Sequence, residues 1–192
     1  MHASNNYAYV GVDGGSGQVE KCLSQLKLNN IDPAKGTIFN AAVTDDGVGN
    51  ITFSHSASFG GAIGGGGDIH VPAMSLATLI GTSVVDLLDV DIQGAEATVF
   101  KSHTALLNAQ VKRVHIGTHG SGHAIADPDW AKGNEIEAPL KAFFEQLGWK
   151  PSFFYPRTHP RCAEGDYAPT PYGPVCFADG VMSFMNPALE GA

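Results

Sequence analysis

Apolar and polar positions along the chain follow two periods, and the alternation between these periods predicts the order of elements. Short apolar runs are typical of strands, and apolar residues that recur every three or four positions are typical of one helix face. The runs predict strands at residues 7–13, 37–43, 51–53, 84–92, 111–120, 152–155 and 175–177. The helical period predicts helices at 19–29, 75–80, 95–107 and 139–147. Alternating strands and helices, followed by an antiparallel pair, predict an α/β sheet with a C-terminal hairpin.

The pattern also predicts one helix face, one hairpin and one long loop in the first part of the chain. The helix at 19–29 has a predicted buried stripe of apolar residues, and the strand at 51–53 is the predicted hairpin partner of the strand at 37–43. Residues 54–70 are rich in glycine, which gives nothing to pack, so they predict a mobile loop. Such a loop is either a plain linker or a lid over a site.

The strongest functional signal lies in residues 84–96. An apolar run gains acidic residues toward its end, breaks at Gln93-Gly94 and continues as a helix that contains Glu96. Ligands of open α/β sheets bind outside the carboxyl ends of the strands, so Asp91 and Glu96 are candidate catalytic residues. The alternative is that Asp91 caps the helix and Glu96 complements its N-terminus. We expect Gly94 to be required by the turn, because glycine permits a positive φ.

Two further strand ends carry polar side chains, Asp13 and Thr118-His119. If the strands are parallel, these ends share one edge with Asp91. The Asp13 carboxylate suits ribose hydroxyls as well as it suits a helix cap. His119 is a candidate general base, with a surface-loop histidine as the alternative. His115, His119 and His123 have helical spacing, but the intervening glycines argue against a helix and therefore against a metal site.

The glycine-rich turn at 14–17 allows two interpretations. A strand, a glycine turn and a helix together can seat a nucleotide or a methionine carboxylate at the helix N-terminus. In the competing interpretation, residues 7–13 are the second strand of a cofactor-binding sheet and Asp13 is its ribose-binding acid.

Composition restricts the class of protein. The chain has 192 residues, of which 43% are hydrophobic and 16% charged, which predicts one soluble globular domain over residues 1–192. A net charge of −8 argues against nucleic-acid partners. We expect no membrane association, because no apolar run reaches membrane-spanning length. Three scattered cysteines and an N-terminus without signal-peptide features predict a reducing, cytoplasmic setting.

Several segments, in order and spacing, resemble the FkbM family of S-adenosylmethionine-dependent methyltransferases over nearly the whole chain. The most specific is the run from Asp89 to Glu96. The others are Val10-Gly11-Val12-Asp13, Leu28-Asn29-Asn30, Asn40-Ala41-Ala42-Val43, Ser75-Leu76, His115-Ile116-Gly117-Thr118-His119, Gly148-Trp149, Phe177-Ala178-Asp179-Gly180-Val181 and Asn186-Pro187.

This resemblance implies a class I, Rossmann-like methyltransferase sheet that is mostly parallel, with S-adenosyl-L-methionine as cofactor. It places Asp13 at the end of the second strand, as the acid that holds the cofactor ribose. It places Asn40 and Ala41 beside the adenine. Asp91 then lies near both the cofactor and the methyl-transfer centre, and His119 ends the fifth strand.

The resemblance also exposes a departure from the family pattern. The family's first strand and its glycine-rich cofactor loop should precede residue 7, where this chain has six residues. We therefore expect the N-terminal part of the fold to be missing and cofactor binding to be weak, unless residues 14–17 replace that loop. The predicted function is O-methylation of a small-molecule or carbohydrate hydroxyl. The alternatives are a non-catalytic binding domain that has lost its cofactor loop, and a nucleotide-binding domain built on residues 14–17.

Overall fold

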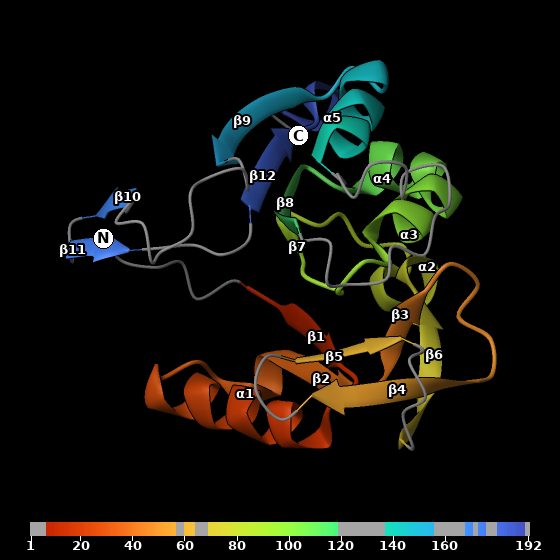
Figure 1. Ribbon diagram of the computed structural model, residues 1–192, viewed down its shortest axis with the longest axis vertical. Helices are drawn as coiled ribbons and strands as arrows, with labels where there is room; N and C mark the ends of the chain where they lie inside the picture. Colours follow the sequence, from red (N-terminus) through yellow and green to blue (C-terminus); the bar gives the residue numbers. More distant parts are fainter. Residues whose placement is uncertain are drawn as a thin grey trace. The chain divides into compact units, whose positions relative to one another are not determined.

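A computed structural model describes residues 7–56, 60–63, 69–118, 137–155, 168–170, 173–175 and 180–190. The chain divides into two compact units, Met1–Leu79 and Ile80–Ala192 (Figure 1). Among the described residues, no helix is long and apolar enough to cross a membrane.

The first unit begins with two parallel strands joined by a helix. Strand β1 (Tyr9–Asp13) pairs with β2 (Gly36–Asn40), so that Asp13 lies opposite Asn40 at the carboxyl end of both. Helix α1 (Ser16–Leu28) and the 3-10 helix η1 (Pro33–Lys35) form the connection. Figure 1 shows α1 running alongside this strand pair. Two strand ends predicted to carry functional groups are thereby brought to one edge.

The predicted buried stripe on this helix is wrong. No side chain of α1 is buried, and Leu23 and Leu28 are 46% and 73% exposed. The half-buried apolar residues are Val19 and Leu26. A two-stranded sheet is narrow, so within this unit it covers only a narrow face of the helix.

A second sheet completes the first unit. It contains β3 (Ala42–Thr44), β4 (Asn50–Ser56), β5 (Gly60–Ile63) and β6 (Ile69–Ser75) in the order β3-β6-β4-β5. Strands β3 and β6 are parallel, and the other pairs are antiparallel. The predicted direct hairpin between residues 37–43 and 51–53 is therefore wrong, because β6 lies between β3 and β4. The predicted loop at 54–70 is also partly wrong, because it contains β5 and the ends of β4 and β6.

The second unit is built on a four-stranded mixed sheet, reached through α2 (Leu76–Ile80), which crosses the boundary between the units. The strands are β7 (Leu88–Val90), β8 (Arg113–Thr118), β9 (Lys150–Tyr155) and β12 (Gly180–Met185), in the order β7-β8-β12-β9. Strands β7 and β8 are parallel, and β12 is antiparallel to both of its neighbours. The predicted antiparallel partner of residues 152–155 was 175–177, and the observed partner is β12. Strands β10 (Ala168–Thr170) and β11 (Gly173–Val175) form a separate antiparallel pair.

The helices of this unit are α3 (Glu96–Ser102), α4 (Thr104–Gln110) and α5 (Glu137–Gln146), followed after β12 by η3 (Pro187–Leu189). The single helix predicted at 95–107 is therefore two helices that meet at His103. Its backbone N–H lies 3.2 Å from both the Val99 and the Phe100 carbonyl oxygens.

Aromatic packing around Phe144 joins the helices to the sheet. Its ring centroid lies 5.3 Å from Phe100 of α3, 5.1 Å from Phe143, 5.2 Å from Trp149 and 4.8 Å from Phe184 of β12. Phe144, Phe100 and Phe184 are almost completely buried. This cluster fixes α3 and α5 on one face of the sheet and so fixes the elements that follow β7 and β8.

Candidate functional site

In the first unit, a network of hydrogen bonds closes the carboxyl ends of β1 and β2. The Asn40 side-chain amide donates to the carbonyl oxygens of Asp13 at 3.0 Å and Gly14 at 2.9 Å. The backbone N–H of Ala41 also donates to the Asp13 carbonyl, at 3.1 Å. Asn40 therefore organises the backbone around Asp13, and Ala41, which is only 2% exposed, is enclosed beside it.

The Asp13 carboxylate is exposed and held in one orientation. Its Oδ1 accepts the backbone N–H of Gly15 at 2.7 Å, a local turn that aspartate side chains commonly form. Gly15, and not Asp13, is the N-cap of α1, so the alternative in which Asp13 caps this helix is wrong. An exposed and oriented carboxylate can accept hydrogen bonds from two vicinal hydroxyls, and it therefore fits a ribose.

The glycine turn before α1 is shorter than predicted. The helix begins at Ser16, and the N–H groups of Gln18 and Val19 already donate to the Gly15 carbonyl oxygen, at 2.9 and 3.1 Å. Gly17 thus lies inside the helix, and the turn consists of Gly14 and Gly15.

In the second unit, β7 and β8 end at the same edge. Val90 lies opposite Ile116 in the parallel register, and Asp91 follows directly. The Asp91 side chain is exposed and lies beside Gly117, where an added Cβ would be 3.4 Å from the Asp91 Cγ. The structure therefore places Asp91 at the carboxyl edge of a parallel strand pair, as predicted.

Glu96 lies under the turn that follows Asp91. The Glu96 side chain is fully buried, and its two carboxylate oxygens accept the backbone N–H groups of Ile92 at 3.1 Å and Gly94 at 2.9 Å. Gly94 has a φ of 103°, which confirms that glycine is needed there, and Gln93 has a φ of 57°. The Gln93 amide donates to Asp91 Oδ1 at 3.0 Å. Asp91 and Glu96 thus belong to one turn, one of them exposed and the other enclosed.

At the end of β8, the fully buried Thr118 hydroxyl donates to Glu137 Oε1 at 2.9 Å, which ties this strand to the first turn of α5. His119 lies outside the described residues. His115 faces β12, where its Nδ1 lies 2.6 Å from Ser183 Oγ. In the part of the chain that is described, no group of three His, Cys, Asp or Glu side chains could hold a metal ion.

Two of these residues, Gln93 and Glu137, are not predicted from the sequence. Gln93 lies within the recognised 84–96 stretch, but nothing in a linear pattern indicates a left-handed backbone at a glutamine. Glu137 is separated from Thr118 by 19 positions, so their hydrogen bond depends on how α5 packs.

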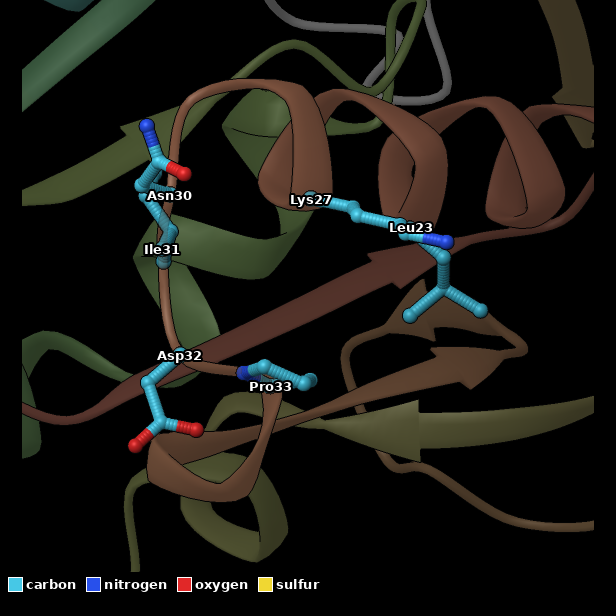
Figure 2. A pocket seen from close by; sticks show the side chains of 6 residues that line it. All are labelled: Leu23, Lys27, Asn30, Ile31, Asp32 and Pro33. Atoms are coloured by element: carbon cyan, nitrogen blue, oxygen red, sulfur yellow. The ribbon is translucent and has the colours of Figure 1, made fainter.

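A hollow of about 490 Å³ in the first unit lies away from these strand ends (Figure 2). It borders the end of α1 and the loop before β2, where the Tyr9 hydroxyl lies 3.4 Å from the Asp32 carbonyl oxygen. Desolvation, with smaller contributions from neighbours that include Tyr7 and Asp32, raises the pKa of Tyr9. The hollow contains none of the predicted site residues. Its lining consists of Leu23, Lys27, Asn30, Ile31, Asp32 and Pro33.

In each unit a parallel strand ends in an exposed carboxylate, at Asp13 and at Asp91, and continues through a turn into a helix. This is the arrangement at which open α/β proteins bind ligands. The chain belongs to the FkbM methyltransferase family, because the family described as "Methyltransferase FkbM domain" matches residues 15–145. The resemblance noted in the sequence is thereby confirmed. Family membership implies a Rossmann-like fold, in agreement with the mixed α/β architecture.

A curated relative agrees with this assignment. The chain is 24% identical over 196 residues to a protein of Jannaschia sp. (strain CCS1) named "Putative methyltransferase". The alignment covers 94% of this chain and 63% of that protein, so the chain spans less than two thirds of its relative. No solved structure matches the chain.

Proposed function

We propose that this chain acts in an S-adenosylmethionine-dependent methyltransferase that O-methylates a small-molecule or carbohydrate hydroxyl. The observation that supports this most directly is the exposed and oriented Asp13 carboxylate at a strand end within a chain of the FkbM family. Its geometry suits the ribose of a nucleoside cofactor.

On this proposal, the chain's residues divide into two groups with different tasks. Asp13 accepts hydrogen bonds from the ribose hydroxyls, and Asn40 keeps the backbone of Asp13 and Gly14 in place for that contact. Asn40 and Ala41 also mark the position of the adenine. When bound, S-adenosylmethionine supplies an electrophilic methyl group on a sulfonium sulfur.

Asp91 is the proposed proton acceptor. An exposed carboxylate at the carboxyl edge of β7 can take the proton of the acceptor hydroxyl as that oxygen becomes methylated, and it can also contact the cofactor. We assign Glu96 to the support of this residue, because its buried carboxylate accepts two backbone N–H groups. His119, outside the described residues, remains the second candidate base.

We also propose that the two units belong to one methyltransferase domain over residues 1–192, with a class I sheet. The family match supports this, because residues 15–145 run across the boundary between Leu79 and Ile80. The sheet of the second unit is consistent with it, because β7, β8 and β9 run in one direction and β12 runs against them.

Cofactor binding can be tested by NMR titration of the ¹⁵N-labelled chain with S-adenosylhomocysteine, a method that also measures weak binding. The Asp13→Ala variant should bind about 5- to 150-fold more weakly, because a charge-assisted contact is worth about 1–3 kcal/mol. Asp45→Ala, which removes another exposed carboxylate of the same unit, should bind like the parent. Equal affinity of Asp13→Ala and the parent would exclude Asp13 from the cofactor site. If the parent does not bind at all, the non-catalytic alternative is favoured.

A further inference from the structure

We propose that Gln93 is a positioning residue, whose side-chain amide holds the Asp91 carboxylate in the orientation needed to accept a proton. The inference rests on the role proposed above for Asp91. Its starting point is the backbone of Gln93, whose φ of 57° lies in the left-handed region that residues other than glycine seldom adopt. Strained residues of this kind persist where the surrounding structure enforces them, and they are concentrated at functional sites.

The surrounding structure enforces this conformation from inside the turn. Glu96 is fully buried and binds the backbone N–H groups on either side of Gln93, those of Ile92 at 3.1 Å and Gly94 at 2.9 Å. Gly94, with its φ of 103°, continues the same tight turn. The Glu96 carboxylate therefore holds the backbone on both sides of Gln93, at Ile92 and at Gly94.

The fixed backbone directs the Gln93 side chain back toward the end of β7. Its Nε2 donates to Asp91 Oδ1 at 3.0 Å, and Gly117 of β8 lies beside the same carboxylate. Glycine would adopt the left-handed backbone conformation with less strain, but it has no side-chain amide to donate. The hydrogen bond to Asp91 is therefore what a glutamine provides at this position and a glycine does not.

This arrangement assigns different consequences to two replacements of Gln93. Gln93→Gly relieves the backbone strain but removes the side-chain amide, so the melting temperature should not fall while the hydrogen bond from residue 93 to the Asp91 carboxylate is lost. Gln93→Asn tolerates the left-handed conformation and keeps an amide that is one methylene shorter, so it should behave as an intermediate. If Gln93 had a purely structural role, amide protection and kcat would change only in variants whose melting temperature also changes.

The first experiment is independent of catalysis and uses the whole ¹⁵N-labelled chain. The side-chain amide signal of Gln93, assigned by its loss in Gln93→Gly, should be protected from hydrogen exchange. The protection should persist in Asp91→Asn, whose side-chain oxygen still accepts, and disappear in Asp91→Ala. The signal of the exposed Gln146 should be the same in all variants. A Gln93 signal that Asp91→Ala leaves unchanged would overturn the inference, whatever the activity.

The second experiment measures transfer of a labelled methyl group from S-adenosylmethionine to methyl glucoside, used as a hydroxyl probe. For Gln93→Gly we expect kcat to fall about 10-fold, with KM for the probe within about twofold of the parent, because misorientation affects the reacting geometry more than binding. Unchanged kcat in Gln93→Gly, together with lost activity in Asp91→Ala, would refute the positioning role. Full activity in Asp91→Ala, or no transfer by the parent, would refute the proposed function, and the NMR experiment would still decide whether Gln93 holds the carboxylate.

Discussion

Replacement of Glu96 by glutamine tests the central turn of the second unit with the smallest change in shape. The parent carboxylate accepts two backbone N–H groups, from Ile92 and from Gly94, in a site closed to solvent. A glutamine amide has one acceptor oxygen, and its NH₂ group is a donor. In Glu96→Gln, one of the two backbone N–H groups therefore faces another donor and loses its partner.

The expected loss of stability follows from that count. A hydrogen bond to a charged group contributes about 1.5–3 kcal/mol, and an orphaned buried donor costs about 1–3 kcal/mol. The two figures count the same lost interaction and are not added, so we expect Glu96→Gln to lower the free energy of unfolding by about 2 kcal/mol. Glu96→Ala removes both acceptors and leaves a void, so its loss should be about twice as large.

Urea unfolding, followed by tryptophan fluorescence, to which the buried Trp149 contributes, and by circular dichroism, measures these differences. The matched control is Glu145→Gln on the exposed face of α5, where the carboxylate lies 3.8 Å from Lys141 Nζ and should contribute less than about 0.5 kcal/mol. If Glu96→Gln unfolds within about 0.5 kcal/mol of the parent and with the same m-value, the carboxylate does not support the turn. If Glu96→Gln and Glu96→Ala lose the same amount, only one of its oxygens is structurally important.

Two further predictions test the framework of each unit. Gly47→Ala should destabilise the first unit by about 2 kcal/mol or more in a thermal unfolding experiment, because the new Cβ would lie 2.4 Å from the Ser75 nitrogen. The control Gly49→Ala has a similar positive φ but open space around the new Cβ, so it should lose only about 1 kcal/mol. Phe144→Ala should lower the stability of the second unit by about 3–5 kcal/mol, whereas Phe153→Ala, a residue that is 53% exposed, should lose less than about 1 kcal/mol. Equal losses within either pair would contradict the packing described here.

Local patterns in the sequence are sufficient to predict the elements around the candidate site but not every strand pairing. The strand-turn-helix order around Asp13 and around Asp91 is observed, because each segment has its own apolar period and glycine turn. The glycine-rich stretch at 54–70 was predicted as a loop, although His55 pairs with Gly61 in the β4–β5 ladder. Glycine has no side chain to alternate between faces, so a strand that contains it has no period for a sequence pattern to detect.

The pairing of β12 shows a different limit. Alternate residues Gly180, Met182 and Phe184 are buried. Val181 and Met185 on the opposite face are also apolar, so the sequence of this strand does not alternate, and no strand was predicted there. Whether that strand pairs with β9 alone or inserts between β8 and β9 depends on which side chains pack on the two faces. Phe184 stacks on Phe144 of α5 at a centroid distance of 4.8 Å. The two residues are 40 positions apart in the sequence, so local periodicity cannot predict this contact.

Sequence patterns also cannot distinguish Asp91 from Glu96, because both acids lie in one turn and both are candidates for catalysis from their position in the sequence. An exposed carboxylate at a strand end remains accessible to a substrate, whereas a buried carboxylate that accepts two backbone N–H groups is committed to the fold. The difference arises from the backbone at Gln93 and Gly94, which turns the Glu96 side chain inward and leaves Asp91 at the edge. Glu96 fixes the backbone on both sides of Gln93, and the Gln93 side-chain amide contacts Asp91. A substitution of Glu96 should therefore change the effect of a substitution of Gln93. A double-mutant cycle of Gln93→Gly and Glu96→Gln should therefore show coupling in the free energy of unfolding, whereas pairs of positions that share no contact should give additive effects.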